Sequence, residues 1–213
     1  VCNGGGGVCY YGNGTLTLTR VTFSYNDTSG FGGGLYLDNL GTTLLTDVDF
    51  DRNTCDYNGA GLAVVNSSLT LDGADFDNNQ AQVDGGGLLF DGGTLVGTDV
   101  DFKENSGRLG GGLMLSEGSA SLEGGTFHRN TATETGGGVF GGWDSSLDIV
   151  NLSFTENTAD SGGGIYSDVG QGLTLDQVTF TRNTATTGNG GGLCNESDST
   201  LTNVVFHGNQ AKW

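Results

Sequence analysis

The chain contains no proline and only one methionine among its 213 residues. Proline cannot donate a backbone hydrogen bond, so its absence suits strands that pair with a neighbour on each side. A collagen-like chain is excluded because no Gly-x-y period accompanies the 42 glycines. Glycine, threonine, asparagine and aspartate are weak helix formers, and we therefore expect little helix.

Basic residues are also scarce. Seven Lys and Arg residues stand against 25 Asp and Glu residues, which gives a formal net charge of -18. Such a chain repels phosphate groups and anionic lipids, so we expect no nucleic-acid partner and no membrane insertion. No apolar run approaches the roughly 18 residues of a membrane-spanning helix. The chain opens on Val1 without a signal-peptide pattern, and we expect a mature segment or an excised portion.

One motif, F-x-x-N, occurs eight times. Its phenylalanines are Phe23, Phe50, Phe76, Phe102, Phe127, Phe154, Phe180 and Phe206. Their spacings are 27, 26, 26, 25, 27, 26 and 26 residues, and a glycine triplet, or Gly-Ala-Gly at 59–61, follows all but the last copy. A fixed period of this length is the signature of a repeat architecture.

Apolar and polar residues alternate within each copy, which predicts short strands. A unit of about 26 residues cannot bury its own apolar face, but units stacked roughly 4.8 Å apart bury a continuous core. The sequence therefore predicts an all-β fold, a single-stranded parallel β-helix (β-solenoid) of about eight coils. In this fold the repeated asparagines would stack their amides into a hydrogen-bonded ladder.

We expect one β-helix domain over residues 1–213. Neither 1-VCNGGGGVC-9 nor 206-FHGNQAKW-213 has the character of a polar or helical cap. We therefore expect either a segment of a longer solenoid or a protomer that stacks head to tail with further copies.

The combination of 154-FTENTA-159 with 162-GGGIYS-167 resembles the repeats of cell-surface parallel β-helix proteins, including the chlamydial polymorphic outer-membrane proteins. The resemblance spans residues 4 to 211. With the general crossover preference, it implies a right-handed coil. It also implies a secreted, extracellular or cell-surface location, neighbouring surface proteins as partners, and no catalytic residue.

These features together predict an extracellular structural protein, used as a rod, filament or stalk for surface display or adhesion, and not an enzyme. Two alternatives come from other classes. One is a carbohydrate-active β-helix enzyme, a lyase or hydrolase, which needs a groove for which the short turns are expected to leave no room. The other is a calcium-binding or ice-binding solenoid.

Carboxylates recur at outward positions beside the phenylalanines of the second to fourth copies. The candidate calcium ligands are Asp49, Asp51, Asp75, Asp77, Asp99 and Asp101. Like charges about 5 Å apart repel each other unless a cation lies among them, and oxygen ligands suit Ca²⁺. The alternative is a solvated acidic face that keeps the rod soluble.

A column two residues after the triplets is apolar although it is predicted to face outward. The candidate interface residues are Cys9, Tyr36, Leu89, Met114, Phe140, Tyr166 and Cys194. A contiguous exposed apolar surface marks a contact site, here for a flanking segment, a neighbouring rod or a glycan-bearing partner. The alternative is that long turns such as 141–146 partly cover it.

Four cysteines follow no zinc-ligand spacing. A local Cys2–Cys9 bridge with Cys55 as a buried thiol is one hypothesis, and a Cys9–Cys194 bond between stacked copies is the other. The candidate glycosylation sites are the sequons at Asn13, Asn66, Asn151 and Asn195. These sequons favour secretion.

Overall fold

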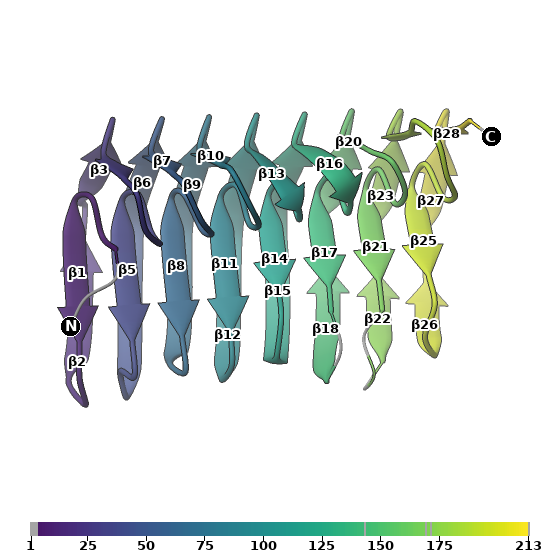
Figure 1. Ribbon diagram of the computed structural model, residues 1–213. Coiled ribbons are helices and arrows are strands. Elements are labelled where there is room, and N and C mark those ends of the chain that lie inside the picture. Colours follow the sequence, from purple (N-terminus) through teal and green to yellow (C-terminus); the bar gives the residue numbers. More distant parts are fainter. Residues whose placement is uncertain (1–3, 143, 169, 171, 213) are drawn as a thin grey trace.

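The computed structural model describes residues 4–142, 144–168, 170 and 172–212. Within these residues the chain is all β, without a helix, and winds as a parallel β-solenoid of about 8 turns spaced about 26 residues apart (Figure 1). Each coil contributes strands to three parallel sheets that run along the rod. The predicted fold class is therefore confirmed.

The first sheet lies on the near side in Figure 1, and each of its strands begins at the residue after a glycine triplet. Its strands, in spatial order, are β1 (Val8–Tyr11), β5 (Leu35–Asp38), β8 (Leu62–Val65), β11 (Leu88–Asp91), β14 (Leu113–Leu115), β17 (Val139–Gly141), β21 (Ile165–Ser167) and β25 (Leu193–Asn195).

The second sheet consists of short strands that follow the asparagines. They are β4 (Asp27–Thr28), β7 (Thr54–Cys55), β10 (Gln80–Ala81), β13 (Ser106–Leu109), β16 (Thr131–Thr135), β20 (Thr158–Ala159), β24 (Thr184–Ala185) and β28 (Gln210–Ala211).

The third sheet carries the phenylalanines. Its main path is β2 (Thr15–Thr19), β6 (Thr42–Asp51), β9 (Ser68–Asp77), β12 (Thr94–Lys103), β15 (Gly118–His128), β18 (Ser145–Val150), β22 (Leu173–Asp176) and β26 (Ser199–Thr202). Where the long strand is interrupted, its second half forms β3 (Thr22–Ser24), β19 (Ser153–Thr155), β23 (Thr179–Thr181) and β27 (Val205–His207).

The phenylalanines form one stack through the core. Consecutive ring centroids lie 4.5 to 5.1 Å apart, and the rings are within 13° of parallel. The rings from Phe50 to Phe180 are at most 1% exposed. This stack holds the coils in register, because a slip of one residue would turn each ring to the outside.

The asparagines form the predicted ladder. From Asn53 to Asn209, each side-chain oxygen accepts two hydrogen bonds from the preceding asparagine, one from its backbone N–H and one from its Nδ2, at 2.9 to 3.1 Å. From Asn53 onward, Nδ2 also donates to the phenylalanine carbonyl of the preceding coil at 2.8 to 2.9 Å. An interior ladder amide thus uses both donors and both acceptor sites.

The two outer positions of the glycine triplets serve different purposes. The first glycine has a φ of 60 to 76° in every coil, a conformation that side chains with a Cβ rarely adopt. At the third glycine the φ is ordinary but space is missing: a Cβ on Gly112 would lie 2.7 Å from the Gly138 carbonyl oxygen. The triplet therefore allows both the turn and the close approach of coils.

Candidate functional site

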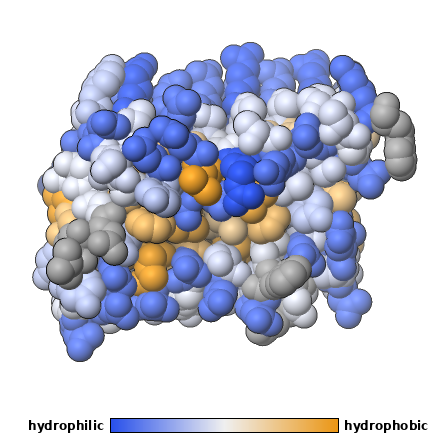
Figure 2. Space-filling view, viewed as in Figure 1, coloured by the Kyte–Doolittle hydropathy of each residue, from blue (hydrophilic) through white to orange (hydrophobic). Residues whose placement is uncertain are grey.

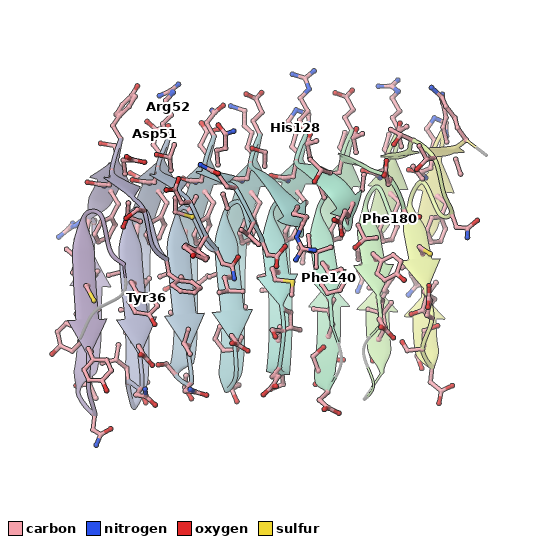
Figure 3. The ribbon with its side chains drawn as sticks, in the orientation of Figure 1. Tyr36, Asp51, Arg52, His128, Phe140 and Phe180 are labelled. Atoms are coloured by element: carbon pink, nitrogen blue, oxygen red, sulfur yellow. The ribbon has the colours of Figure 1, made fainter. Side chains whose placement is uncertain are left out.

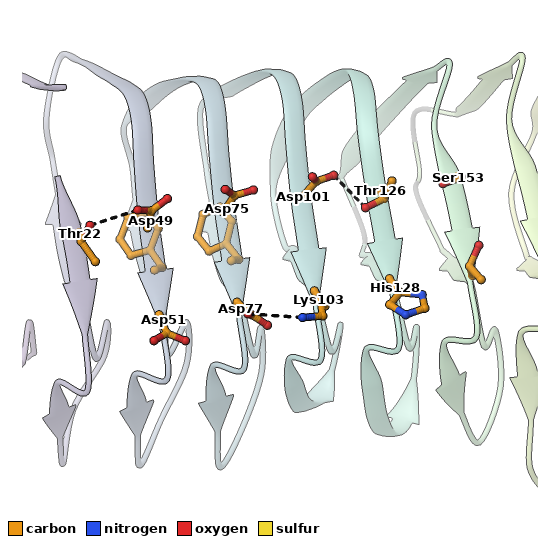
Figure 4. A pocket seen from close by; sticks show the side chains of 13 residues that line it. Thr22, Asp49, Asp51, Asp75, Asp77, Asp101, Lys103, Thr126, His128 and Ser153 are labelled. Carbon is orange, nitrogen blue, oxygen red and sulfur yellow. Dashed lines mark hydrogen bonds and ion pairs between the residues drawn. The ribbon is translucent and has the colours of Figure 1, made fainter. Parts of the chain in front are cut away.

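A groove of about 590 Å³ lies on the outer face of the third sheet (Figure 4). Its side chains come from two outward positions, one before and one after each phenylalanine. The first row is Thr22, Asp49, Asp75, Asp101, Thr126 and Ser153, and the second row is Asp51, Asp77, Lys103, His128 and Thr155. The expectation that the short turns leave no room for a groove is therefore wrong.

Left-handed residues bound each strand segment of the groove floor. In the second coil these are Asp47 with a φ of 50° and Arg52 with a φ of 52°. In the third coil they are Gly73 and Asn78, at 64° and 56°. Because the strand changes direction at both points, the segment between them forms a short, separately oriented face. Sequence reasoning missed these corners, because no glycine marks the left-handed conformation at Asp47, Arg52 or Asn78.

Parallel register places the rows in straight lines along the rod. Asp49 pairs with Asp75 and Asp75 pairs with Asp101 as Cα partners on neighbouring strands. The same register aligns Asp77 with Lys103 in the second row. Side chains in such a line are about one strand spacing, roughly 4.8 Å, from each other.

Four of the five groove carboxylates have side-chain partners. In the first row, Thr22 donates to Asp49 at 3.1 Å and Thr126 donates to Asp101 at 2.8 Å. In the second row, Asp51 pairs with Arg52 at 2.9 Å, and Asp77 pairs with Lys103 at 3.6 Å. Among the described residues, Asp75 alone of the five has no hydrogen-bonding or ion-pairing side chain.

Asp75 lies between two other carboxylates in its row. Desolvation raises the pKa of its carboxyl group above the usual range, and the negative charges of Asp101, Asp49 and Asp77 add to this effect. The ionised form of Asp75 is thus disfavoured in the folded protein, while the flanking carboxylates are held by hydroxyl donors.

Replacing Asp75 by asparagine is expected to stabilise the calcium-free protein at neutral pH by about 0.5 kcal/mol, because like charges on adjacent strands repel. The folded-state pKa lies above the unfolded one, so the penalty is absent at low pH. This penalty develops as the pH rises through the unfolded-state pKa and the folded-state pKa of Asp75. Melting temperatures of the wild type and Asp75→Asn, measured in EDTA across the acidic range, should converge at low pH and separate above it.

Asp148→Asn is the matched control. Asp148 is exposed on the same sheet, but its in-register neighbours are Ser121 and Thr174. Its substitution should change the melting temperature little at any pH. A separation between wild type and Asp75→Asn that shrinks as pH rises would contradict the repulsion account.

The candidate calcium ligands are only partly brought together. Five of them line the groove, but Asp99 lies outside it, at the left-handed corner two residues before Asp101. In the part of the chain that the structure describes, no group of three or more His, Cys, Asp or Glu side chains is arranged to hold a metal ion. The calcium site remains a prediction.

A row of charges borders the groove, one residue beyond the second row. Glu104, Arg129, Glu156 and Arg182 alternate in sign from coil to coil. Arg129 pairs with Glu156 at 2.8 Å, and longer contacts of 3.9 Å join Arg129 to Glu104 and Arg182 to Glu156. Arg129 and Arg182 each lie two residues after the phenylalanine of an F-x-x-N motif. The spacing of the motif alone could therefore have predicted this row of charges.

The apolar column lies on the first sheet, where Figure 2 shows apolar atoms gathered along the middle of the near face. The expectation that the whole column is exposed is wrong in its first half. Tyr36 is 6% exposed and Leu89 is 4% exposed. Phe31 stacks on Tyr36 at 5.9 Å, and Tyr57 stacks on Phe31 at 5.5 Å. The ring of Phe31 therefore covers Tyr36.

The second half of the apolar column is more open. Met114, Phe140 and Tyr166 are each half-buried, and the rings of Phe140 and Tyr166 stack at 5.7 Å (Figure 3 shows Phe140). The Tyr166 hydroxyl donates to Glu196 at 2.6 Å. The interface role of the column remains a prediction, now centred on these residues.

The cysteines differ in their state. Cys9 is disulfide-bonded, whereas Cys55 and Cys194 are free thiols. Cys2 lies outside the described residues, so the predicted Cys2–Cys9 pairing stays a prediction. The alternative Cys9–Cys194 bond between stacked copies would require a Cys9 thiol, but Cys9 is already disulfide-bonded in this structure.

The two free thiols are expected to react differently with iodoacetamide in the native protein. Burial raises the pKa of the Cys55 thiol to about 12, and the Cys55 residue is 2% exposed. Cys194 is half-buried, and its pKa is raised mainly by desolvation. Mass spectrometry should find Cys194 labelled first and Cys55 labelled only on unfolding, because the thiolate is the reactive form. Equal native labelling would contradict the burial of Cys55.

The candidate glycosylation sites differ in accessibility. Asn13, Asn66 and Asn151 are exposed, whereas Asn195 is half-buried and its amide donates to the Ser197 carbonyl. A glycan can be attached only to an accessible amide, so the first three positions suit the prediction better than Asn195.

Comparison with known families supports the resemblance seen in the sequence. The repeat of the Chlamydia polymorphic membrane proteins matches residues 151–168 and 177–196. These two segments run from β19 to β21 and from β23 to β25, and each contains one F-x-x-N motif and one glycine triplet. Searches of curated proteins and of solved structures returned no match. No helix of the described residues is long and apolar enough to cross a membrane.

Proposed function

We propose that this chain is an extracellular structural protein that forms a β-helical rod for display or adhesion at a cell surface. The observation that carries the proposal is the agreement between the solenoid and the two matches to the repeat of the Chlamydia polymorphic membrane proteins. A rod of this kind holds outward residues in fixed rows, and repeat solenoids use such extended surfaces for contact.

The rod has the internal support that an exposed spacer needs. The core phenylalanines and the asparagine ladder repeat in every coil, so each coil is joined to its neighbours by the same contacts. The acidic surface keeps such a rod dispersed, because a net charge far from zero opposes non-specific association.

Surface labelling tests this proposal. Antibodies raised against the purified chain should label intact cells of the organism that produces it, and protease added to intact cells should remove the signal. A cytoplasmic protein labelled only after permeabilisation is the control for cell integrity. Labelling of the chain only after permeabilisation would refute surface display.

The proposed partners are copies of the chain stacked head to tail, neighbouring surface proteins, or glycans. We also propose that the chain is not an enzyme. The alternative, a carbohydrate-active lyase or hydrolase, would require that the groove turn over a polysaccharide, and the release of new sugar ends from a bound polysaccharide would favour it.

Calcium binding at the groove carboxylates is the proposed cofactor interaction. Its support is the in-register alignment of Asp49, Asp75 and Asp101, whose mutual repulsion a divalent cation would relieve. Isothermal titration is expected to show heat on adding Ca²⁺, together with a raised melting temperature, and both effects should weaken in Asp75→Asn. Absence of heat and of any melting shift would leave only the solvated acidic face.

A further inference from the structure

We propose that the groove on the third sheet binds an uncharged oligosaccharide that lies along the rod axis. This inference rests on the proposed surface function and names the ligand class of one face. The groove runs from the first coil, at Thr22, to the sixth coil, at Ser153. That distance is five strand spacings, or roughly 24 Å. A short chain of sugar rings fits such a length better than a single small molecule.

The charges in the groove disfavour a polyanion, and they favour a polycation only over the acidic coils. Five aspartates repel a polyanion. A polycation placed along the groove would meet Lys103 and His128, which occupy the centre of the second row between the acidic coils and the hydroxyl-bearing coils (Figure 4). Part of the acidic charge is already compensated, because Lys103 pairs with Asp77 and Arg52 pairs with Asp51. An uncharged ligand is repelled neither by the aspartates nor by Lys103, so it can occupy the whole length of the groove.

The hydrogen-bonding groups in the groove match those of sugar hydroxyls. A hydroxyl group both donates and accepts, so it pairs with carboxylates and with other hydroxyls. Asp75 offers a carboxylate without a side-chain partner, and the described structure gives Ser153 and Thr155 no side-chain hydrogen bond. Carboxylate acceptors therefore lie in the second to fourth coils, and hydroxyl groups, which both donate and accept, lie at Thr22 and in the fifth and sixth coils. A polycation would make little use of the hydroxyl end.

The spacing of the rows supports an extended ligand. Each row presents one side chain per coil, because Asp75 pairs in register with Asp101, and Thr126 pairs with Ser153. This repeat of roughly 4.8 Å is comparable to the length of one pyranose unit in an extended chain. Successive sugar units would thus meet successive coils, so that weak polar contacts add up along the groove.

An array of uncharged glycans tests the proposal, with the 213-residue chain in EDTA as the probe protein. The array includes the tetrasaccharides of maltose, cellulose, xylan, mannan and chitin type. The best binder is then titrated into wild type, Asp75→Ala, Ser153→Ala and Asp148→Ala. Asp148 lies exposed on the same sheet but outside the groove, and serves as the matched control. Melting curves of each variant check the fold.

We expect at least one uncharged glycan to bind. Its affinity should fall about tenfold in Asp75→Ala and measurably in Ser153→Ala, as expected for losing a hydrogen bond to a charged group and to a neutral one. Affinity should be unchanged in Asp148→Ala. The proposal would be overturned if no glycan on the array binds, or if the bound glycan has the same affinity for the groove variants as for the wild type. Tighter binding of spermine or polygalacturonate would also overturn it. Surface labelling is measured separately, so a labelled rod that binds no glycan refutes this inference alone.

Discussion

Replacing Asn105 by alanine is expected to destabilise the fold by roughly 4 kcal/mol, since four buried hydrogen bonds of about 1 kcal/mol each are lost. Asn105 accepts from the backbone N–H and the Nδ2 of Asn79 at 2.9 and 3.0 Å. It donates to the Phe76 carbonyl at 2.8 Å and to Asn130 at 3.0 Å. The residue is 1% exposed, so water cannot replace these partners.

Chemical denaturation of Asn105→Ala beside two comparison variants measures the effect. Asn105→Asp keeps an acceptor but loses both donors, and it should lose comparable stability. Asn209→Ala removes the same kind of side chain from the last described coil, where it is only half-buried, so its loss should be smaller. If Asn105→Ala and Asn209→Ala unfold at the same denaturant concentration, then the ladder contributes no more stability in the interior coils than in the last described coil.

Replacing Gly112 by alanine is expected to cost about 3 kcal/mol, because overpacking of a close contact forces neighbouring backbone to move. An added Cβ would lie 2.7 Å from the Gly138 carbonyl oxygen and 2.9 Å from Cδ1 of Phe127. Neither atom belongs to the free end of a flexible side chain. The third triplet position is glycine in all eight coils, whereas the middle position accepts alanine once, at Ala60.

Gly41→Ala is the control for Gly112→Ala. Gly41 is exposed, lies outside the left-handed region, and a Cβ there would meet only the Gly14 carbonyl oxygen at 3.6 Å. Its substitution should leave stability nearly unchanged in the same denaturation assay. If the two variants unfold at the same denaturant concentration, then close approach of coils does not explain the third glycine.

The sequence predicts those parts of the fold that every coil repeats. Phe102 and Asn105 recur at fixed offsets, so their columns indicate a ring stack and an amide ladder before any coordinates are known. The columns also predict that Asp49, Asp75 and Asp101 align. Predictions from these repeated positions fail where one coil differs from the next. Tyr36 is buried because Phe31, a residue without a counterpart in most coils, lies over it.

The groove was harder to predict for a related reason. Its shape depends on left-handed corners at residues such as Asp47 and Arg52, which have no glycine to signal them. Which carboxylate lacks a partner depends on the hydroxyl groups of Thr22 and Thr126, which flank the three aspartates of the first row. The pattern predicts the row, but only coordinates distinguish Asp75 from its neighbours.

The most direct test of the in-register solenoid is hydrogen exchange of asparagine side-chain amides, followed by NMR. The rows of the groove and of the apolar column exist only if the coils stack as the ladder requires. The Nδ2 protons of Asn79, Asn105 and Asn130 should remain protected long after those of the exposed Asn66 and Asn151 have exchanged. Exchange of the ladder protons as fast as the exposed ones would contradict the stacked coils and the faces they present.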